Sequence, residues 1–175
     1  YDLPWTKSDT IVASIGQGYT LSTPLQLAVM TSRIVTNGNK IVPTILKRQD
    51  EHKKFPKVLS LNKDIYSFIK KGMFNTVNNI NGTAYNSRLI NSKYNMSGKT
   101  ATSQVRRISM QEREQGIKKN EELPREKRDH AMFVGSYPYE KPEYAFSIVV
   151  EHGGSGSKAA APIAKDLCKK LYELL

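Results

Sequence analysis

Met96-Ser97-Gly98-Lys99-Thr100-Ala101-Thr102-Ser103-Gln104-Val105 is the stretch that decides how the rest of the chain is interpreted. It is a strand-like run with a lysine and hydroxyl side chains where simple apolar and polar alternation would suffice. Side chains alternate between the two faces of an extended strand, so Lys99 and Ala101 share one face and Thr100 lies on the other. We interpret the run as one wall of an anion-binding site for acyl transfer.

The residue types in this run suit that chemistry. A lysine ammonium can hold a carboxylate or lower the pKa of a neighbouring hydroxyl, and the Thr100 hydroxyl can donate to the same carboxylate. The backbone N–H of Thr102 can face a reacting carbonyl oxygen, and removing such a donor costs roughly 10²–10³ in rate. The alternative is an ordinary sheet strand with a solvated lysine, and the run alone leaves both interpretations open.

Other segments add a resemblance that spans nearly the whole chain. In order and spacing they resemble the C-terminal half of a class B penicillin-binding protein transpeptidase domain, in which Lys-Thr-Gly is a known signature. The segments that carry it are Ser14-Ile15-Gly16-Gln17-Gly18-Tyr19, Thr23-Pro24-Leu25-Gln26-Leu27-Ala28, Gly72-Met73 through Gly82-Thr83-Ala84, and Gly98-Lys99-Thr100. Further segments resemble the elongation-specific members: Asp129-His130, Glu151-His152-Gly153-Gly154 and Ala160-Ala161-Pro162-Ile163-Ala164.

The resemblance implies a peptidoglycan D,D-transpeptidase that cross-links stem peptides through an acyl-serine intermediate. It implies catalytic roles for Lys99 and Thr102 and substrate-binding roles for Thr100, Ala101 and Ser103. It calls for no cofactor and no metal. The implied ligands are stem peptides and beta-lactams, and the implied partners are a lipid II glycosyltransferase and elongation-complex proteins. By the same analogy the intact protein is anchored in the inner membrane and faces the periplasm.

Two features depart from the family pattern. Ala101 stands where the family's motif usually has glycine, and its methyl group narrows the groove along which a substrate backbone would run. We expect activity to survive this change, with beta-lactam affinity and acylation rate in question.

The second departure is the absence of a well-placed nucleophile. Ser-x-x-Lys occurs at Ser60/Lys63, Ser67/Lys70 and Ser155/Lys158, and with 15 serines and 19 lysines among 175 residues chance alone gives about one or two such matches. We expect the nucleophilic serine to lie upstream of residues 1–175, which would be the C-terminal portion of one transpeptidase domain and inactive alone.

Composition limits the other functions. The net charge of +11 invites binding to nucleic acid or to an anionic membrane surface. The positive charge is not clustered, however, because the most charged segment, 106–129, mixes eight Lys or Arg with six Asp or Glu. We therefore expect no nucleic-acid binding, and interpret 106–130 as a charged loop insertion. A non-catalytic peptide- or partner-binding module stays open as an alternative, as does a basic binder of nucleic acid or of a membrane surface.

Cysteine and histidine usage offers no metal site. The single cysteine, Cys168, cannot form an internal disulfide and fits simple burial in an amphipathic stretch. The three histidines are scattered in the sequence, without the spacing of a helical metal pair. Asp129 and His130 are expected to have a structural role.

The periodicities predict an α/β fold of the α+β type, with about three antiparallel core strands packed by helices. The strands are expected at 96–105, 131–137 and 143–151, with an extended segment at 9–18 and a short strand-like return at 40–46. Helices are expected at 22–36, 63–77 and 160–174, the last with Ile163, Leu167, Leu171 and Leu174 against the sheet. On the second helix Ile65, Phe68, Ile69, Met73 and Val77 are expected to form core.

Overall fold

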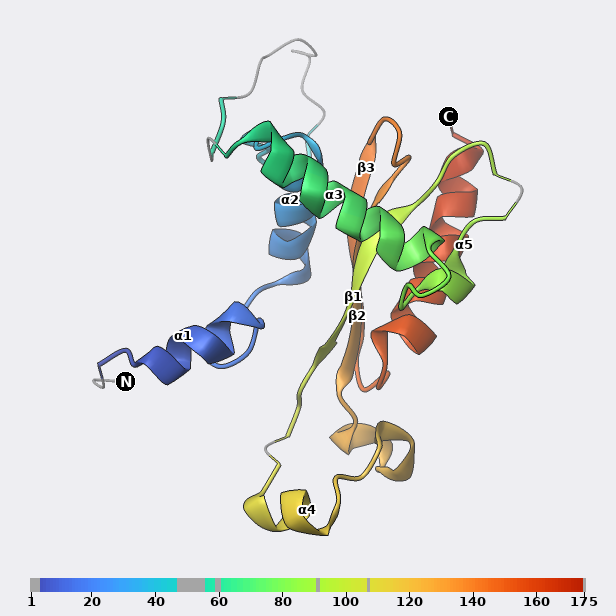
Figure 1. Ribbon diagram of the computed structural model, residues 1–175. Coiled ribbons are helices and arrows are strands. Elements are labelled where there is room, and N and C mark those ends of the chain that lie inside the picture. The colour runs from blue at the N-terminus through green and yellow to red at the C-terminus, as the bar shows by residue number, and fades with distance from the viewer. Residues whose placement is uncertain (1–3, 47–55, 59–60, 91, 107, 175) are drawn as a thin grey trace.

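A three-stranded antiparallel sheet organises the chain in the computed structural model, which describes residues 4–46, 56–58, 61–90, 92–106 and 108–174. The strands β1 (Ser97–Ser103), β2 (His130–Tyr137) and β3 (Tyr144–Val150) follow one another across the sheet in chain order. Helix α2 (Pro24–Val35) and helix α5 (Ala161–Tyr172) lie on opposite sides of it, and α3 (Lys63–Asn78) crosses β1 (Figure 1). The predicted fold class, with helices on both sides of the sheet, is confirmed.

The core lies between β2 and the C-terminal helix. Phe133 and Tyr137 of β2 are fully buried. Facing them, α5 contributes small side chains, since Ala161, Ala164 and Cys168 are also fully buried. Large residues on the strand and small ones on the helix let the two elements approach closely, as dense interior packing requires.

The local signals for α2 act as the sequence predicts. Thr23 caps the helix, its hydroxyl accepting from the Gln26 N–H while the Gln26 side chain accepts from the Thr23 N–H. Pro24 occupies the first turn, where a missing N–H costs nothing. The helix ends before Asn37 and Gly38, which both have positive φ angles.

Two predictions of extended structure are wrong. Residues 9–18 do not form an extended segment, because α1 (Lys7–Ser14) begins at a capping box between Thr6 and Asp9. Residues 40–46 form no strand; the described pairing nearby is a single bridge between Asn39 and Lys57. Since α1 buries none of its residues, hydrophobic periodicity gave little sign of it.

The apolar stripes predicted on two helices are only partly right. On α5, Leu171 packs against the core, but Ile163 is 48% exposed, and Leu174, past the end of the helix, is 74% exposed. The buried face is set instead by the small residues Ala161, Ala164 and Cys168, which belong to the same core cluster as Phe133. On α3, Met73 is buried as expected, whereas Phe68 is 80% exposed.

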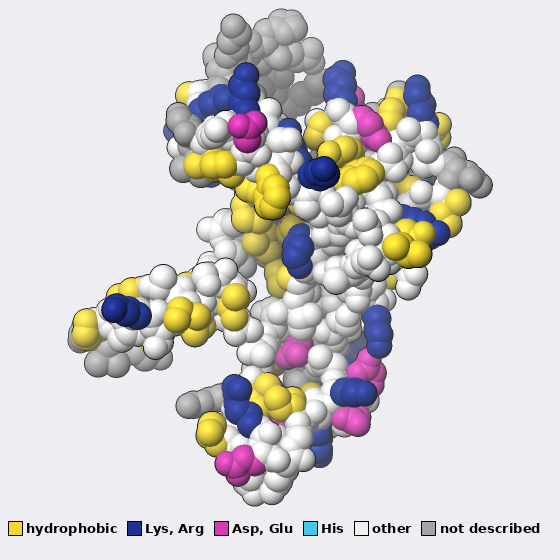
Figure 2. Space-filling view, in the orientation of Figure 1, with side chains coloured by type: hydrophobic (Ala, Val, Ile, Leu, Met, Phe, Trp, Pro, Cys, Tyr) yellow, Lys and Arg dark blue, Asp and Glu magenta, His cyan; other side chains and the backbone are white. Residues whose placement is uncertain are grey.

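The charged segment forms a lobe beyond the end of the sheet (Figure 1). It holds a short helix, α4 (Met110–Gln115), and two 3-10 turns, η2 (Asn120–Glu122) and η3 (Arg125–Lys127). None of the described residues between 99 and 130 is buried. Figure 2 shows positive and negative side chains mixed over this lobe. Nowhere in the described residues is a helix both long and apolar enough to cross a membrane.

Candidate active site

The strand β1 divides into a buried half and an exposed half. Ser97 is 1% exposed and Gly98 is buried, whereas Lys99 and the three residues from Ala101 to Ser103 are exposed. Among the described residues β1 pairs only with β2, so its outer edge carries no strand. The five predicted site residues therefore lie together on the open end of an edge strand.

The buried half anchors β1 tightly to β2. A Cβ atom added at Gly98 would come within 2.2 Å of the Phe133 ring and 2.5 Å of the Val134 carbonyl oxygen, so only glycine fits there. Next to it, the hydroxyls of Ser97 and Ser136 share a buried hydrogen bond of 2.9 Å. This anchor fixes the position of Lys99, one residue further along.

The Lys99 side chain stays close to its own strand. Its Nζ donates to the Thr100 carbonyl oxygen at 2.6 Å. Within the part of the chain that the structure describes, no carboxylate lies within 4 Å of this ammonium group. The positive charge therefore faces open space, where it can meet an anionic ligand.

Thr83 is a site residue that the sequence analysis missed. The Thr83 and Thr100 hydroxyls lie 2.8 Å apart and share a hydrogen bond. The turn that presents Thr83 is tight, because a Cβ added at Gly82 would lie 2.3 Å from the Thr76 carbonyl oxygen. The resemblance drew attention to Gly82-Thr83-Ala84 as a turn leading toward the strand, but no pattern in the sequence pairs the two threonines.

The segments around His130 and His152 hold the strand ends, and His130 pairs with Ser103 at the last position of β1. Asp129 accepts from the Val105 backbone N–H at 3.3 Å and from the Asn120 side chain at 3.1 Å. The His130 Nδ1 accepts from the His152 backbone N–H at 2.9 Å. These contacts agree with the structural role expected for Asp129 and His130.

The described Ser-x-x-Lys matches do not form nucleophile and base pairs. Lys70 donates to Asn37 Oδ1 at 2.9 Å, and Lys158 donates to Glu121 Oε1 at 2.7 Å. No hydrogen bond joins either lysine to its serine among the described contacts. The third match, at Ser60, lies outside the described residues.

The described residues also lack a metal centre. No three histidine, cysteine, aspartate or glutamate side chains in that part of the chain are close enough to hold an ion. Burial raises the pKa of the Cys168 thiol to about 12, so the group is neutral and unreactive near neutral pH.

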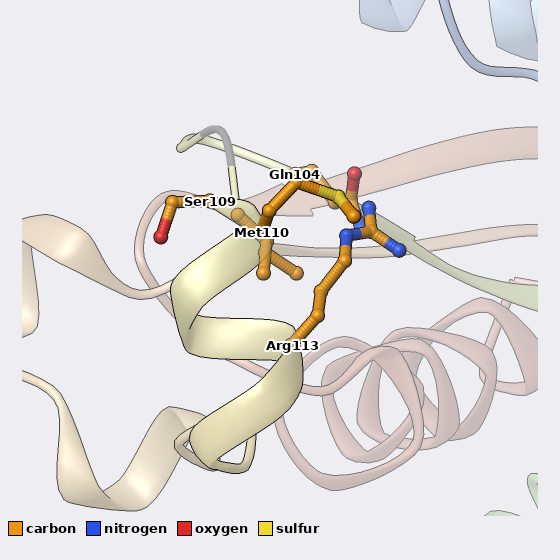
Figure 3. Close-up of a pocket in the computed structure, with 5 residues that line it drawn as sticks. Gln104, Ser109, Met110 and Arg113 are labelled. Atoms are coloured by element: carbon orange, nitrogen blue, oxygen red, sulfur yellow. The ribbon is translucent and has the colours of Figure 1, made fainter.

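A pocket opens just past the exposed end of β1. It has a volume of about 820 Å³ and is lined by Gln104, Ile108, Ser109, Met110 and Arg113. Figure 3 shows the Arg113 side chain reaching from α4 toward Gln104. The sequence analysis placed Gln104 in the strand-like run and treated the other four residues only as part of a charged insertion.

Comparison with known proteins agrees with the resemblance. The family model of the penicillin binding protein transpeptidase domain matches residues 2–169. Peptidoglycan D,D-transpeptidase MrdA of Haemophilus influenzae is 34% identical over 94% of this chain and 26% of its own length. MrdA of Escherichia coli K12 is 30% identical over 87% of this chain and 25% of its own length. The chain thus spans about a quarter of the length of these curated relatives.

Solved structures show the same likeness in three dimensions. PBP2 from Helicobacter pylori, in complex with MreC, is 33% identical with a TM-score of 0.75, covering 99% of this chain and 29% of that one. PBP2 of Pseudomonas aeruginosa in complex with WCK 5153 is 31% identical with a TM-score of 0.73, covering 98% of this chain and 33% of that one.

Proposed function

Because the chain belongs to the penicillin-binding protein transpeptidase family, we propose that it forms one wall of the active site of an elongation-type peptidoglycan D,D-transpeptidase. The observation that carries the proposal is the exposed end of β1. There, Lys99 and Thr100 lie beside a strand edge that no described strand covers, and the run Lys99-Thr100-Ala101 resembles the family's Lys-Thr-Gly signature. An extended peptide can lie along such an edge as an added strand.

Each residue then has a distinct role. The Lys99 ammonium attracts the substrate carboxylate and assists proton transfer at the serine. Thr100, held by Thr83, donates its hydroxyl to the terminal carboxylate of D-Ala-D-Ala. The Thr102 N–H binds the oxyanion, and the Thr102 and Ser103 side chains contact the substrate backbone.

The reaction has two balanced halves. A serine hydroxyl attacks the carbonyl carbon of the penultimate D-alanine and forms an ester. The peptide bond to the terminal D-alanine breaks, and D-alanine leaves as an amine that takes up the serine proton. An amine of a neighbouring stem peptide then attacks the ester, forms the cross-link, loses a proton and returns the serine to its starting state.

In this proposal the nucleophilic serine lies outside residues 1–175. Its support is that the relatives are about four times longer and that the described Ser-x-x-Lys lysines are bonded elsewhere. By analogy with these relatives, the whole protein sits in the inner membrane with this domain in the periplasm. By the same family analogy it works with a lipid II glycosyltransferase and elongation proteins; the complex of Helicobacter pylori PBP2 with MreC supports only a partner of the MreC kind.

A fluorescent penicillin tests the proposal. The full-length polypeptide that carries these residues should be labelled covalently, and peptide mapping should place the label on a serine outside residues 1–175. The isolated chain should remain unlabelled. Labelling of the isolated chain contradicts the placement of the nucleophile, and no labelling of the full-length protein favours a non-catalytic binding module.

A further inference from the structure

The pocket past β1 continues the proposed substrate path. Its first lining residue, Gln104, directly follows Ser103, the last residue of the strand. The other lining residues come from the segment that leads into α4 and from α4 itself. A ligand extended along β1 past Ser103 therefore meets this pocket next.

The proposed roles on β1 fix the direction in which a donor peptide runs. If Thr100 holds the terminal carboxylate and the Thr102 N–H holds the scissile carbonyl, the upstream residues of the peptide pass Ser103 toward Gln104. An extended chain advances about 3.3 Å per residue, so the third and second residues of the stem peptide reach the pocket.

The pocket contains one cation, the Arg113 guanidinium, that has no acidic partner among the described residues. The neighbouring carboxylate of Glu112 is engaged by Arg106 at 2.7 Å and by the Ser109 backbone N–H at 3.2 Å. In the described part of the chain no carboxylate lies within 4 Å of the Arg113 guanidinium. Figure 3 places that guanidinium beside the Gln104 amide.

The supporting helix is short but well fixed. Ser109 caps α4 through a capping box with Glu112, and the Arg106 to Glu112 ion pair ties the helix to the strand's exit segment. Ile108 and Met110 supply an apolar wall on the same pocket. An oriented guanidinium over an apolar wall is a suitable receptor for a carboxylate on a peptide side chain.

We infer that this pocket is a specificity subsite for the donor stem peptide, in which Arg113 binds a carboxylate upstream of the scissile bond. Gln104 donates a second hydrogen bond. Stem peptides offer such carboxylates at their second residue, a glutamate joined through its side chain, and at a diaminopimelate third residue. The inference rests on the proposed transpeptidase function. It adds which part of the donor peptide the enzyme recognises, namely a carboxylate upstream of the scissile bond.

D-alanine release by the full-length protein from synthetic pentapeptides tests the inference. One peptide keeps both carboxylates, one is amidated at the second residue, and one at the third. We expect amidation at the contacted residue to lower kcat/KM about ten-fold, the usual effect of one hydrogen-bonded charge. Arg113→Ala should reduce the acid-to-amide ratio to about one, and Arg113→Lys should retain part of it.

The ratio is an internal measurement, so partial loss of folded protein cancels from it. Arg125→Ala, on the exposed turn η3 and outside the pocket, is the matched control and should keep the full ratio. Equal turnover of the acidic and amidated peptides by the unaltered protein overturns the inference, as does loss of the ratio in the Arg125 variant. Failure of the protein both to release D-alanine and to react with penicillin overturns the proposed function and the subsite with it.

Discussion

The two halves of β1 differ sharply in burial. Ser97 and Gly98 are buried, with Gly98 against Phe133, while the residues from Lys99 to Ser103 are exposed except for the half-buried Thr100. Yet the β2 residues opposite Thr100 and Thr102, Phe133 and Ala131, are fully buried. One strand thus has a buried half with no room for an extra atom and an exposed half that rests on buried β2 residues, and no strand among the described residues pairs with its outer edge.

The comparison predicts that substitutions in the buried half of β1 lower stability, whereas substitutions in the exposed half lower activity. Gly98→Ala should have the largest effect, because its methyl group would overlap the Phe133 ring and the Val134 carbonyl. Such overpacking costs about 1–3 kcal/mol or more. Soluble yield and thermal unfolding of the full-length protein measure it. A normal melting temperature would show that the two halves are equally tolerant.

Lys99→Ala tests the exposed half of β1. Since the side chain is exposed, stability should change by no more than about 0.5 kcal/mol. Penicillin acylation should fall by at least about 10²-fold, because the positioned proton donor and cation are lost. Stopped-flow acylation rates give the result, and an unchanged rate would remove Lys99 from the proposed mechanism.

Thr83→Val tests whether the hydroxyl pair orients Thr100. One lost hydrogen bond should raise the KM for a D-Ala-D-Ala peptide about two- to ten-fold with little change in kcat. Thr83→Ser keeps the hydroxyl and is the matched control. Equal KM values for the two variants would show that the 2.8 Å contact between the Thr83 and Thr100 hydroxyls does not affect substrate binding.

Ala101→Gly should have a small and opposite effect. Removing the methyl group widens the groove and should speed penicillin acylation about two-fold, a change typical of exposed positions. Ala101→Val should slow it. Identical rates for the three side chains would show that no substrate backbone passes this position.

The smallest predicted effect concerns the lobe beyond the open half. Hydrogen bonding from the Ser109 backbone N–H, and then from Arg106, keeps the pKa of Glu112 below its ordinary value of 4.5. A carboxylate with a lowered folded-state pKa stabilises the fold above its unfolded pKa, and that support is lost as the pH falls through the folded pKa. Hydrogen exchange at α4 should therefore quicken below about pH 4.5, while β2 stays protected. Glu112→Gln should abolish this pH dependence.

The sequence predicted the parts of the fold that rest on strong periodicity or on local caps. Thr23 and Pro24 placed the start of α2, and alternation placed β2 and β3 to within one residue at each end. Helix α1 was missed for two reasons. Its capping box begins at Thr6, ahead of the segment predicted to be extended, and the helix has no buried face that would give an apolar periodicity.

The site was predicted less fully, for a physical reason. The five residues from Lys99 to Ser103 adjoin one another in sequence, so a motif can find them. Thr83 contacts the strand from a turn, and Arg113 lies just past the strand's end on a separate lobe. Such proximity depends on tertiary packing that local sequence patterns do not encode. Ile163 and Leu174 were misjudged for the same reason, because the alanines and Cys168 of α5 form the face that joins the core cluster with Phe133.

The free outer edge of β1 has a consequence for solubility. Unpaired strand edges invite association with the edges of other copies, and natural proteins guard against this with charged residues on the edge. Lys99 lies on that edge, so two copies docking edge to edge would bring like charges together. The same ammonium that attracts an anionic peptide therefore discourages aggregation, and its replacement by a neutral residue would remove both effects at once.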